Sequence, residues 1–184
     1  MTFASQALRL TPFVAVSLLA ACAGVTMPRP PSVVVPESLR APAGESLLRT
    51  LQADGVQIYE CRAKEADASA AEWVFVAPEA RLVDDQGTLV GRHYAGPTWE
   101  AGDGSKVVGT VRAKIDAPQA GTIPWLLLAT RSTGKPGLFA KVSSIQRVAT
   151  SGGAMPATGC DKAAVGQVAR VPYKAEYAQY APTL

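Results

Sequence analysis

The sequence of 184 residues is 48% hydrophobic and has a formal net charge of +3. This length fits one domain with its own hydrophobic core. Because no block of like charges occurs, the sequence gives no indication of a nucleic-acid partner. His93 is the single histidine, and zinc sites need three or four clustered ligands, so we expect no metal and no cofactor.

The N-terminal segment ends in a pattern that resembles the lipobox of bacterial lipoproteins. An apolar stretch follows Arg9 and closes with Leu-Ala-Ala-Cys at residues 19–22. In such proteins a diacylglycerol group joins the thiol of Cys22, and a peptidase that accepts small side chains cuts before this cysteine. The stretch is shorter than the roughly 20 apolar residues of a spanning helix. Residues 1–21 are therefore predicted to be a lipoprotein signal peptide.

Acylation of Cys22 predicts a lipid anchor in a membrane of the cell envelope. Stable attachment takes two or more acyl chains, and bacterial lipoproteins carry two or three. In lipoproteins of this type an aspartate after the cysteine often retains the protein at the inner membrane. Ala23 stands there instead, which favours the outer membrane, at its periplasmic face or its surface. The alternative is a plain secretory signal cut at Ala21 or Ala23, which leaves Cys22 as an odd thiol.

Residues 22–42 are predicted to form a tether after the acylated cysteine. Five prolines fall in this segment, at positions 28, 30, 31, 36 and 42. They favour polyproline II, with ~3.1 Å per residue, and hence a semi-rigid spacer. The three valines at 33–35 interrupt this pattern and are candidates for pairing along a sheet edge.

Residues 43–184 are predicted to form one β domain. Apolar and polar residues alternate over 106–115, as in a strand with one wet face. Asp54-Gly55 predicts a hairpin turn between strands at 47–53 and 56–62. Further strands are predicted over 73–76, 88–94, 125–130 (apolar on both faces and therefore central), 139–149 (long enough to contain a bulge) and 171–180.

The helix signal is weak along the whole chain. Residues 46–53 have leucines at helical spacing, and residues 161–168 are compatible with one helical turn. Roughly eight to ten short strands with Gly/Pro-rich turns favour an all-β fold, either a single antiparallel sandwich or a barrel.

Two cysteines remain in the predicted mature chain, Cys61 and Cys160. Outside the cytoplasm two thiols in one small domain are expected to pair. The disulfide would close a loop of about 100 residues, worth on the order of 4–5 kcal/mol in the chain-entropy model. The alternative is two buried thiols that never meet.

Several ordered patches of the β domain carry a family resemblance. They are Gly-Val-Gln-Ile-Tyr-Glu-Cys at 55–61, His-Tyr-Ala-Gly-Pro-Thr-Trp at 93–99, Asp-Gly-Ser-Lys-Val-Val-Gly at 103–109 and Ile-Pro-Trp-Leu-Leu at 123–127. Residues 39–182 thereby resemble a family of secreted bacterial and fungal proteins catalogued only as a domain of unknown function. The resemblance implies a compact β domain made for secretion, and it implies no activity and no catalytic residue.

His93 is the residue with the clearest chemical potential. His93, Tyr94, Trp99, Glu100 and Asp103 surround two predicted turns, so they are candidates to gather at one end of the sheet as a binding site. A histidine oriented by a carboxylate is the basic unit of general acid–base catalysis. The alternative is a histidine that holds a loop through a hydrogen bond.

The tryptophans divide into two predicted groups. Trp73 and Trp125 stand in apolar runs and are predicted to be core, whereas Trp99 is the best candidate to line a pocket or groove.

Three functional hypotheses follow from these residues. The first is a non-catalytic envelope domain that binds a small molecule, a glycan or another envelope protein. The second is a hydrolase-type enzyme with His93 as general base and Glu100 or Asp103 as its partner. The third is a structural protein that binds only itself. No serine stands in a G-x-S-x-G elbow and no Gly-rich phosphate loop occurs, which favours the first hypothesis.

Overall fold

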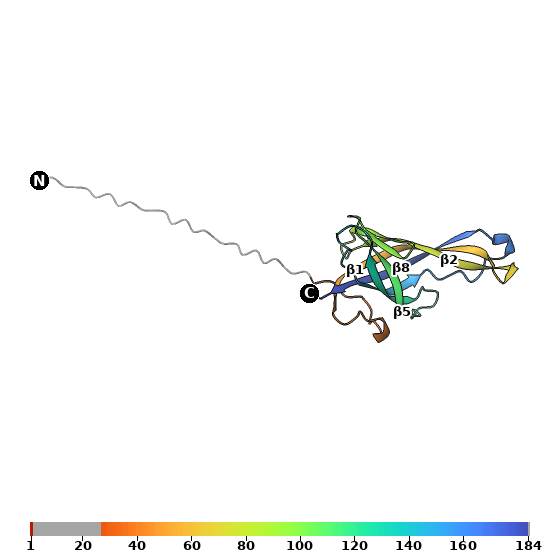
Figure 1. The fold of residues 1–184 in the computed structure, drawn as a ribbon, viewed down its shortest axis with the longest axis horizontal. Coiled ribbons are helices and arrows are strands. Elements are labelled where there is room, and N and C mark those ends of the chain that lie inside the picture. Colours follow the sequence, from red (N-terminus) through yellow and green to blue (C-terminus); the bar gives the residue numbers. More distant parts are fainter. Residues whose placement is uncertain (2–26, 184) are drawn as a thin grey trace.

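Eight antiparallel strands close into one barrel in the computed structural model, which describes Met1 and residues 27–183 (Figure 1). The strands are β1 (Glu45–Lys64), β2 (Asp67–Val83), β3 (Leu89–Tyr94), β4 (Thr98–Ala101), β5 (Lys106–Ile115), β6 (Trp125–Ser132), β7 (Ser144–Gly152) and β8 (Val168–Pro182). Each strand pairs with the next, and β8 pairs with β1. The all-β prediction is confirmed, and closure makes the fold a barrel.

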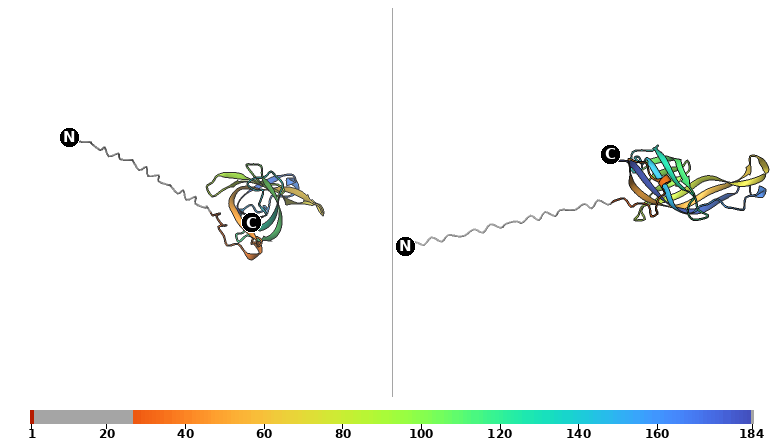
Figure 2. Two further views of the ribbon diagram at one scale, coloured as in Figure 1. Left: turned by 60° about the vertical axis from the view of Figure 1, so that its left-hand side comes forward. Right: turned by 90° about the horizontal axis from the view of Figure 1, so that it is seen from below.

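The first two strands are too long for the barrel and extend beyond it. Residues 60–74 of the β1–β2 hairpin and residues 153–169 form an arm at one end (Figures 1 and 2). The Cys61–Cys160 disulfide crosses this arm, so the predicted pairing is confirmed. Trp73 is half-buried and donates from Nε1 to the Thr158 carbonyl at 2.9 Å. The prediction that Trp73 belongs to the core is therefore wrong.

The predicted turn at Asp54-Gly55 is also wrong, because β1 runs through it without interruption. Gly55 faces the β2 backbone so closely that a Cβ there would lie 2.5 Å from the Cα of Ala80. The glycine thus serves the close approach of two strands. The alternative of a helix over 46–53 is excluded, since these residues belong to β1.

Two other local predictions are confirmed with shifted boundaries. The register of β7 against β8 shifts between Val148 and Ser151, which is the predicted bulge, and Ala149 there has φ +48°. However, β7 begins only at Ser144, and residues 139–143 precede it. The helical turn within 161–168 is the 3-10 helix η2 (Lys162–Ala164). The amides of Ala163 and Ala164 donate to the Asp161 carboxylate that precedes this helix.

The described part of the predicted tether packs against the barrel. The amide of Ser32 donates to Glu176 at 2.7 Å, and Thr50 Oγ1 donates to the Arg29 carbonyl at 2.6 Å. A 3-10 helix, η1 (Glu37–Leu39), then buries Leu39 completely. Residues 29–39 are therefore part of the folded unit rather than a free spacer.

Leu39 is the centre of a second apolar cluster on the outside of the barrel. It contacts Trp125 and Val148, with Val33 and Val35 beside them. Strand β6 is apolar on both faces because one face lines the barrel and the other lies under this segment. The prediction that Trp125 is core is confirmed. The valines at 33 and 35 pack here through their side chains, and residues 33–35 form no strand.

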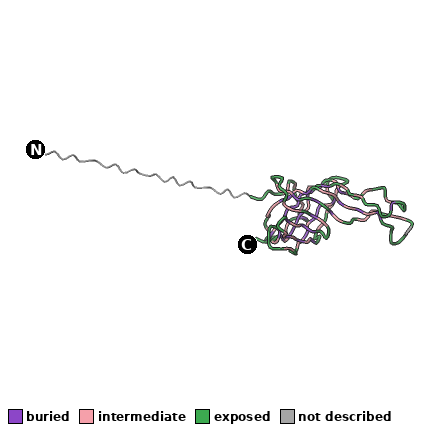
Figure 3. Tube along the Cα trace, turned by 90° about the horizontal axis from the view of Figure 1, so that it is seen from above, coloured by how far each residue is buried: buried purple, intermediate pink, exposed green. Residues whose placement is uncertain are grey.

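The main core lies inside the barrel, and the arm is largely exposed (Figure 3). The closed sheet, this core and the disulfide all lie within residues 27–183, so a chain that starts at Met27 contains the complete described unit. In that part of the chain no helix is long and apolar enough to cross a membrane. The predicted signal peptide (residues 1–21) and Cys22 fall outside the described residues, apart from Met1.

Candidate ligand pocket in the barrel

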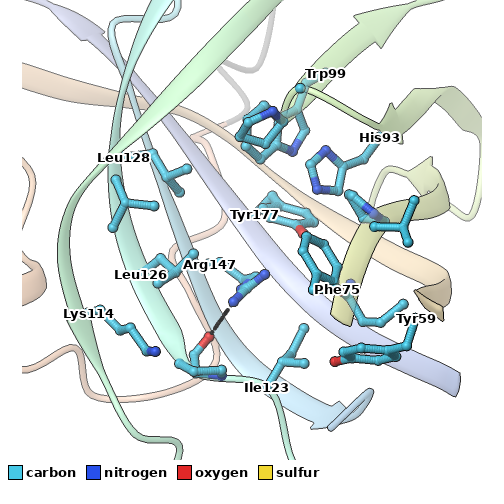
Figure 4. A pocket seen from close by; sticks show the side chains of 17 residues that line it. Tyr59, Phe75, His93, Trp99, Lys114, Ile123, Leu126, Leu128, Arg147 and Tyr177 are labelled. Atoms are coloured by element: carbon cyan, nitrogen blue, oxygen red, sulfur yellow. Dashed lines mark hydrogen bonds between the residues drawn. The ribbon is translucent and has the colours of Figure 1, made fainter. Parts of the chain in front are cut away.

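The barrel contains a pocket of about 430 Å³ at the end that carries the arm (Figure 4). Every strand contributes to its wall. An eight-stranded barrel has an interior that is either filled by side chains or wide enough for one small ligand. Here core side chains fill the barrel end where β1 begins and β8 ends, and the end that carries the arm is hollow. The lining side chains include Gln57, Tyr59, Phe75, Val76, His93, Trp99, Val111, Lys114, Leu126, Leu128, Arg147 and Tyr177.

An aromatic trio, His93, Trp99 and Tyr177, forms one wall of the pocket. His93 and Trp99 lie directly opposite each other in the β3–β4 register, and their rings stack with centroids 4.2 Å apart. Tyr177 meets both rings edge-on, at 5.1 Å and 5.4 Å. Gly109 on β5 leaves room for the indole, since a Cβ there would lie 2.9 Å from Trp99 Cζ3.

His93 is neutral in this wall and has a defined tautomer. Its Nδ1 lies 2.8 Å from the carbonyl oxygen of Thr98. Because a carbonyl only accepts, Nδ1 carries the hydrogen and Nε2 keeps its lone pair. Complete burial lowers the pKa of His93 to about 3, although the hydrogen bond to Thr98 opposes this shift. The ring is therefore uncharged at neutral pH.

The structure divides the predicted site residues between the two faces of the sheet. Strand alternation directs His93 and Trp99 inward, whereas Tyr94 and Glu100 lie outside. The Tyr94 hydroxyl donates to Glu100 at 2.5 Å, and Arg92 lies 3.2 Å from the same carboxylate. The hydrogen bond from Tyr94 holds the pKa of Glu100 below its usual range and raises the pKa of Tyr94.

Asp103 occupies a third position, in the turn between β4 and β5. Its carboxylate accepts from the amide and hydroxyl of Ser105 and from the amide of Leu138, at 2.8, 2.5 and 2.8 Å. The hydroxyl of Ser105, followed by the Leu138 amide, lowers the pKa of Asp103 to about 2. Asp103 therefore joins two loops and does not contribute to the pocket.

The histidine–carboxylate pair of the hydrolase hypothesis is not formed. His93 bonds to the Thr98 carbonyl, Glu100 bonds to Tyr94 and Arg92, and Asp103 bonds to Ser105 and Leu138. The expectation that all five candidate residues meet in one site is wrong, because neighbouring strand residues face opposite sides. His93 and Trp99 remain as pocket residues.

Arg147 is a pocket residue that the sequence analysis missed. Its Nε and Nη2 donate to the Pro124 carbonyl at 3.0 and 2.9 Å (Figure 4). Arg147 lines the pocket together with His93, Tyr59 and Tyr177, and its charge lowers the pKa that each of these groups would otherwise have. Arg147 stands two residues after Ile145 on β7, and residues two apart share a face of a strand. The apolar Ile145 was therefore the signal that could have placed Arg147 on the inner face.

Two buried donors in the pocket wall lack a partner. Gln57 Nε2 and Trp99 Nε1 form no hydrogen bond among the described residues. Their side chains belong to residues that are 2% and 1% exposed. A buried donor without an acceptor is costly, and both nitrogens are shielded within the wall. In the described part of the chain, no three side chains of the metal-binding types gather.

The barrel and the few residues before it match one family of known proteins. A family model described as "Protein of unknown function (DUF3455)" matches residues 42–181. This range contains all the pocket residues and the disulfide. No curated protein and no solved structure matches the chain. Because the match covers most of the sequence, the chain belongs to the DUF3455 family of proteins of unknown function.

Proposed function

We propose that this protein is a lipid-anchored envelope protein whose barrel binds a small, mostly apolar molecule without transforming it. The observation that carries this proposal is the pocket of about 430 Å³. Ligand pockets of proteins range over ~300–1,000 Å³ and combine apolar walls with a few polar groups. The pocket has this composition. Its apolar wall includes the aromatic trio, Leu126 and Leu128, and its polar groups include Arg147 and Gln57.

The rim of the pocket supports an apolar ligand. Phe75, Val76 and Val111 line the pocket although they are 50%, 44% and 49% exposed. Large apolar side chains at an opening are typical of ligand-binding grooves. A glycan fits less well, because a sugar needs many more polar partners than this wall offers.

The pocket opens away from the proposed anchor. Met27 and Pro28 line a surface depression with Asp84 and Leu138, at the barrel end opposite the β3–β4 turn. Gly96 and Pro97 of that turn line the pocket. An anchor at Cys22 stands a few residues before Met27, so the opening would face the aqueous compartment. The ligand would then arrive from solution rather than from the anchoring membrane.

The anchor is tested by replacing Cys22 with serine. We expect the full-length protein to incorporate labelled palmitate and to sediment with membranes, and Cys22→Ser to abolish the labelling, because the thiol is the site of acylation. Ala23→Ser is the control and should retain both properties. Equal labelling of Cys22→Ser and the parent protein would contradict the anchor.

The binding function is tested with N-phenyl-1-naphthylamine, a neutral probe that becomes fluorescent in apolar surroundings. A chain of residues 27–184 is expected to bind it saturably. Val111→Asp places a charge at the rim, where a bound apolar molecule would desolvate it, so the probe should bind at least about fivefold more weakly.

Val165 provides the matched control, since it is 47% exposed and stands outside the pocket wall. Val165→Asp should leave the affinity for the probe unchanged. The function would be refuted by the absence of saturable binding in the parent protein, or by equal effects of the two substitutions.

A further inference from the structure

We infer that the ligand is an organic acid: a single carboxylate on an aromatic or aliphatic body, with Arg147 as the residue that binds the carboxylate. This inference rests on the proposed function and specifies its ligand. It comes from the charges in the pocket, the orientation of the guanidinium and the kind of hydrogen bond that the wall leaves open.

The first argument is the charge of the wall. Arg147 and Lys114 are its two charged side chains, and no aspartate or glutamate lines the pocket in the described part of the chain. The ion pairs found among the described residues involve neither of these cations. Arg147 is partly buried among apolar side chains, where a charge is costly without a counter-ion. A ligand carboxylate would supply that counter-ion.

The second argument is the orientation of Arg147. A guanidinium has five N–H donors in a fixed plane. The Pro124 carbonyl accepts one from Nε and one from Nη2, which fixes the plane. Of the other three, one is close enough to the Tyr177 hydroxyl for a hydrogen bond that counters the raised pKa of Tyr177. Planar, two-point binding of a carboxylate is the interaction for which arginine is best suited.

A β-bulge follows Arg147 on β7. The β7–β8 ladder is regular at Arg147 and Val148 and then shifts register before Ser151. Within the bulge Ala149 has φ +48°, a conformation that costs a residue with a Cβ some free energy. Bulges of this kind commonly redirect side chains beside binding sites.

The third argument is the type of hydrogen bond that the wall can still form. Gln57 Nε2 and Trp99 Nε1 are donors, and both lack an acceptor among the described residues. An ionised carboxylate is an acceptor only, so it matches a wall whose charged side chains, Arg147 and Lys114, are both donors. The apolar body would lie against the stacked rings of His93 and Trp99. Lys114 stands exposed at the opening, where its charge would attract an approaching acid.

Matched acids and alcohols test this inference directly. The pairs are 3-phenylpropionate with 3-phenylpropanol, and octanoate with 1-octanol. Calorimetric titration of residues 27–184 at pH 7 should show at least one acid binding about tenfold or more tightly than its alcohol, because hydrogen bonds to charged groups are the stronger ones. The aromatic and aliphatic pairs show which kind of body the pocket accepts.

Arg147→Met removes the charge and the donors while keeping an apolar stem. We expect this variant to lose about tenfold in affinity for the acid and to keep its affinity for the alcohol. Arg131 on β6 is exposed, so Arg131→Met is the matched control and should bind both compounds like the parent. The comparison of acid and alcohol in the parent protein holds even if Arg147→Met proves unstable.

The outcomes separate the inference from the function on which it rests. Tighter binding of the acid, lost in Arg147→Met alone, supports both. Equal binding of acid and alcohol, or an unchanged acid affinity in Arg147→Met, overturns the inference and leaves the pocket function intact. Binding of no acid, no alcohol and no neutral probe overturns both.

Discussion

Replacing Cys61 and Cys160 together with alanine is expected to lower the free energy of unfolding by about 3–5 kcal/mol. The disulfide joins residues separated by 99 positions, so its loss frees a long loop in the unfolded chain. Cys61 is fully buried, and its replacement also removes packing at the base of the arm. For a domain of this size, the midpoint of thermal unfolding should fall by about 10 °C.

The measurement is chemical denaturation of residues 27–184 with and without a reductant. Reduction of the parent protein should reproduce the destabilisation, and the double variant should not respond to the reductant. The arm keeps other attachments, since the Cys61 amide donates to the Gln167 carbonyl at 2.9 Å and Tyr59 donates to the Gly153 carbonyl at 2.6 Å. A loss below 1 kcal/mol would show that these attachments suffice.

Replacing His93 with asparagine is expected to remove a pH dependence of stability between pH 6.5 and pH 3. Above pH 6.5 His93 is neutral in both the folded and the unfolded state. Below it the unfolded chain takes up a proton at the ordinary pKa, whereas burial holds the folded pKa at about 3. The parent protein should therefore lose stability as the pH falls, by up to about 5 kcal/mol in total from this group.

The asparagine side chain tests the role of His93 protonation, because it does not titrate in this pH range but can still donate a hydrogen bond to the Thr98 carbonyl. His93→Asn should be less stable than the parent at pH 7 by about 1–3 kcal/mol, since it loses the stacked contact with Trp99 and leaves a void. The two stabilities should converge as the pH falls and cross between about pH 4 and about pH 6.

Denaturant titrations at pH 7, 6, 5 and 4 on both proteins provide the measurement. Asp103, with its pKa near 2, titrates in both proteins, so its effect cancels in the difference. Parallel curves over this range would mean that the folded protein tolerates a protonated His93, contrary to its burial.

The interior of the barrel contains contacts that no local pattern displayed. Arg147 is one charged residue in a mixed segment, and only the register of β7 between β6 and β8 places it against the Pro124 carbonyl. The hydrogen bond from His93 to the Thr98 carbonyl could not be predicted from the sequence either. Carboxylates close in sequence were expected, but Glu100 lies on the other face of its strand and Asp103 bonds across to the Leu138 loop.

What the sequence determined by itself was local or compositional. Alternation of apolar and polar side chains predicted the all-β class and β5, because period two follows directly from strand geometry. The number of cysteines and the expected compartment predicted the Cys61–Cys160 pair. The tertiary structure decided every feature that depends on contacts between distant segments.

Closure of β1 against β8 makes a barrel rather than a sandwich, and it joins residues at opposite ends of the domain. The same applies to Gly55, which resembled a turn residue but permits the approach of β2. It applies also to Leu39, which resembled part of a spacer but lies buried against Trp125. Each side chain's role depends on which strand or segment lies across from it, and residue types and spacing along the chain carry no direct record of that pairing.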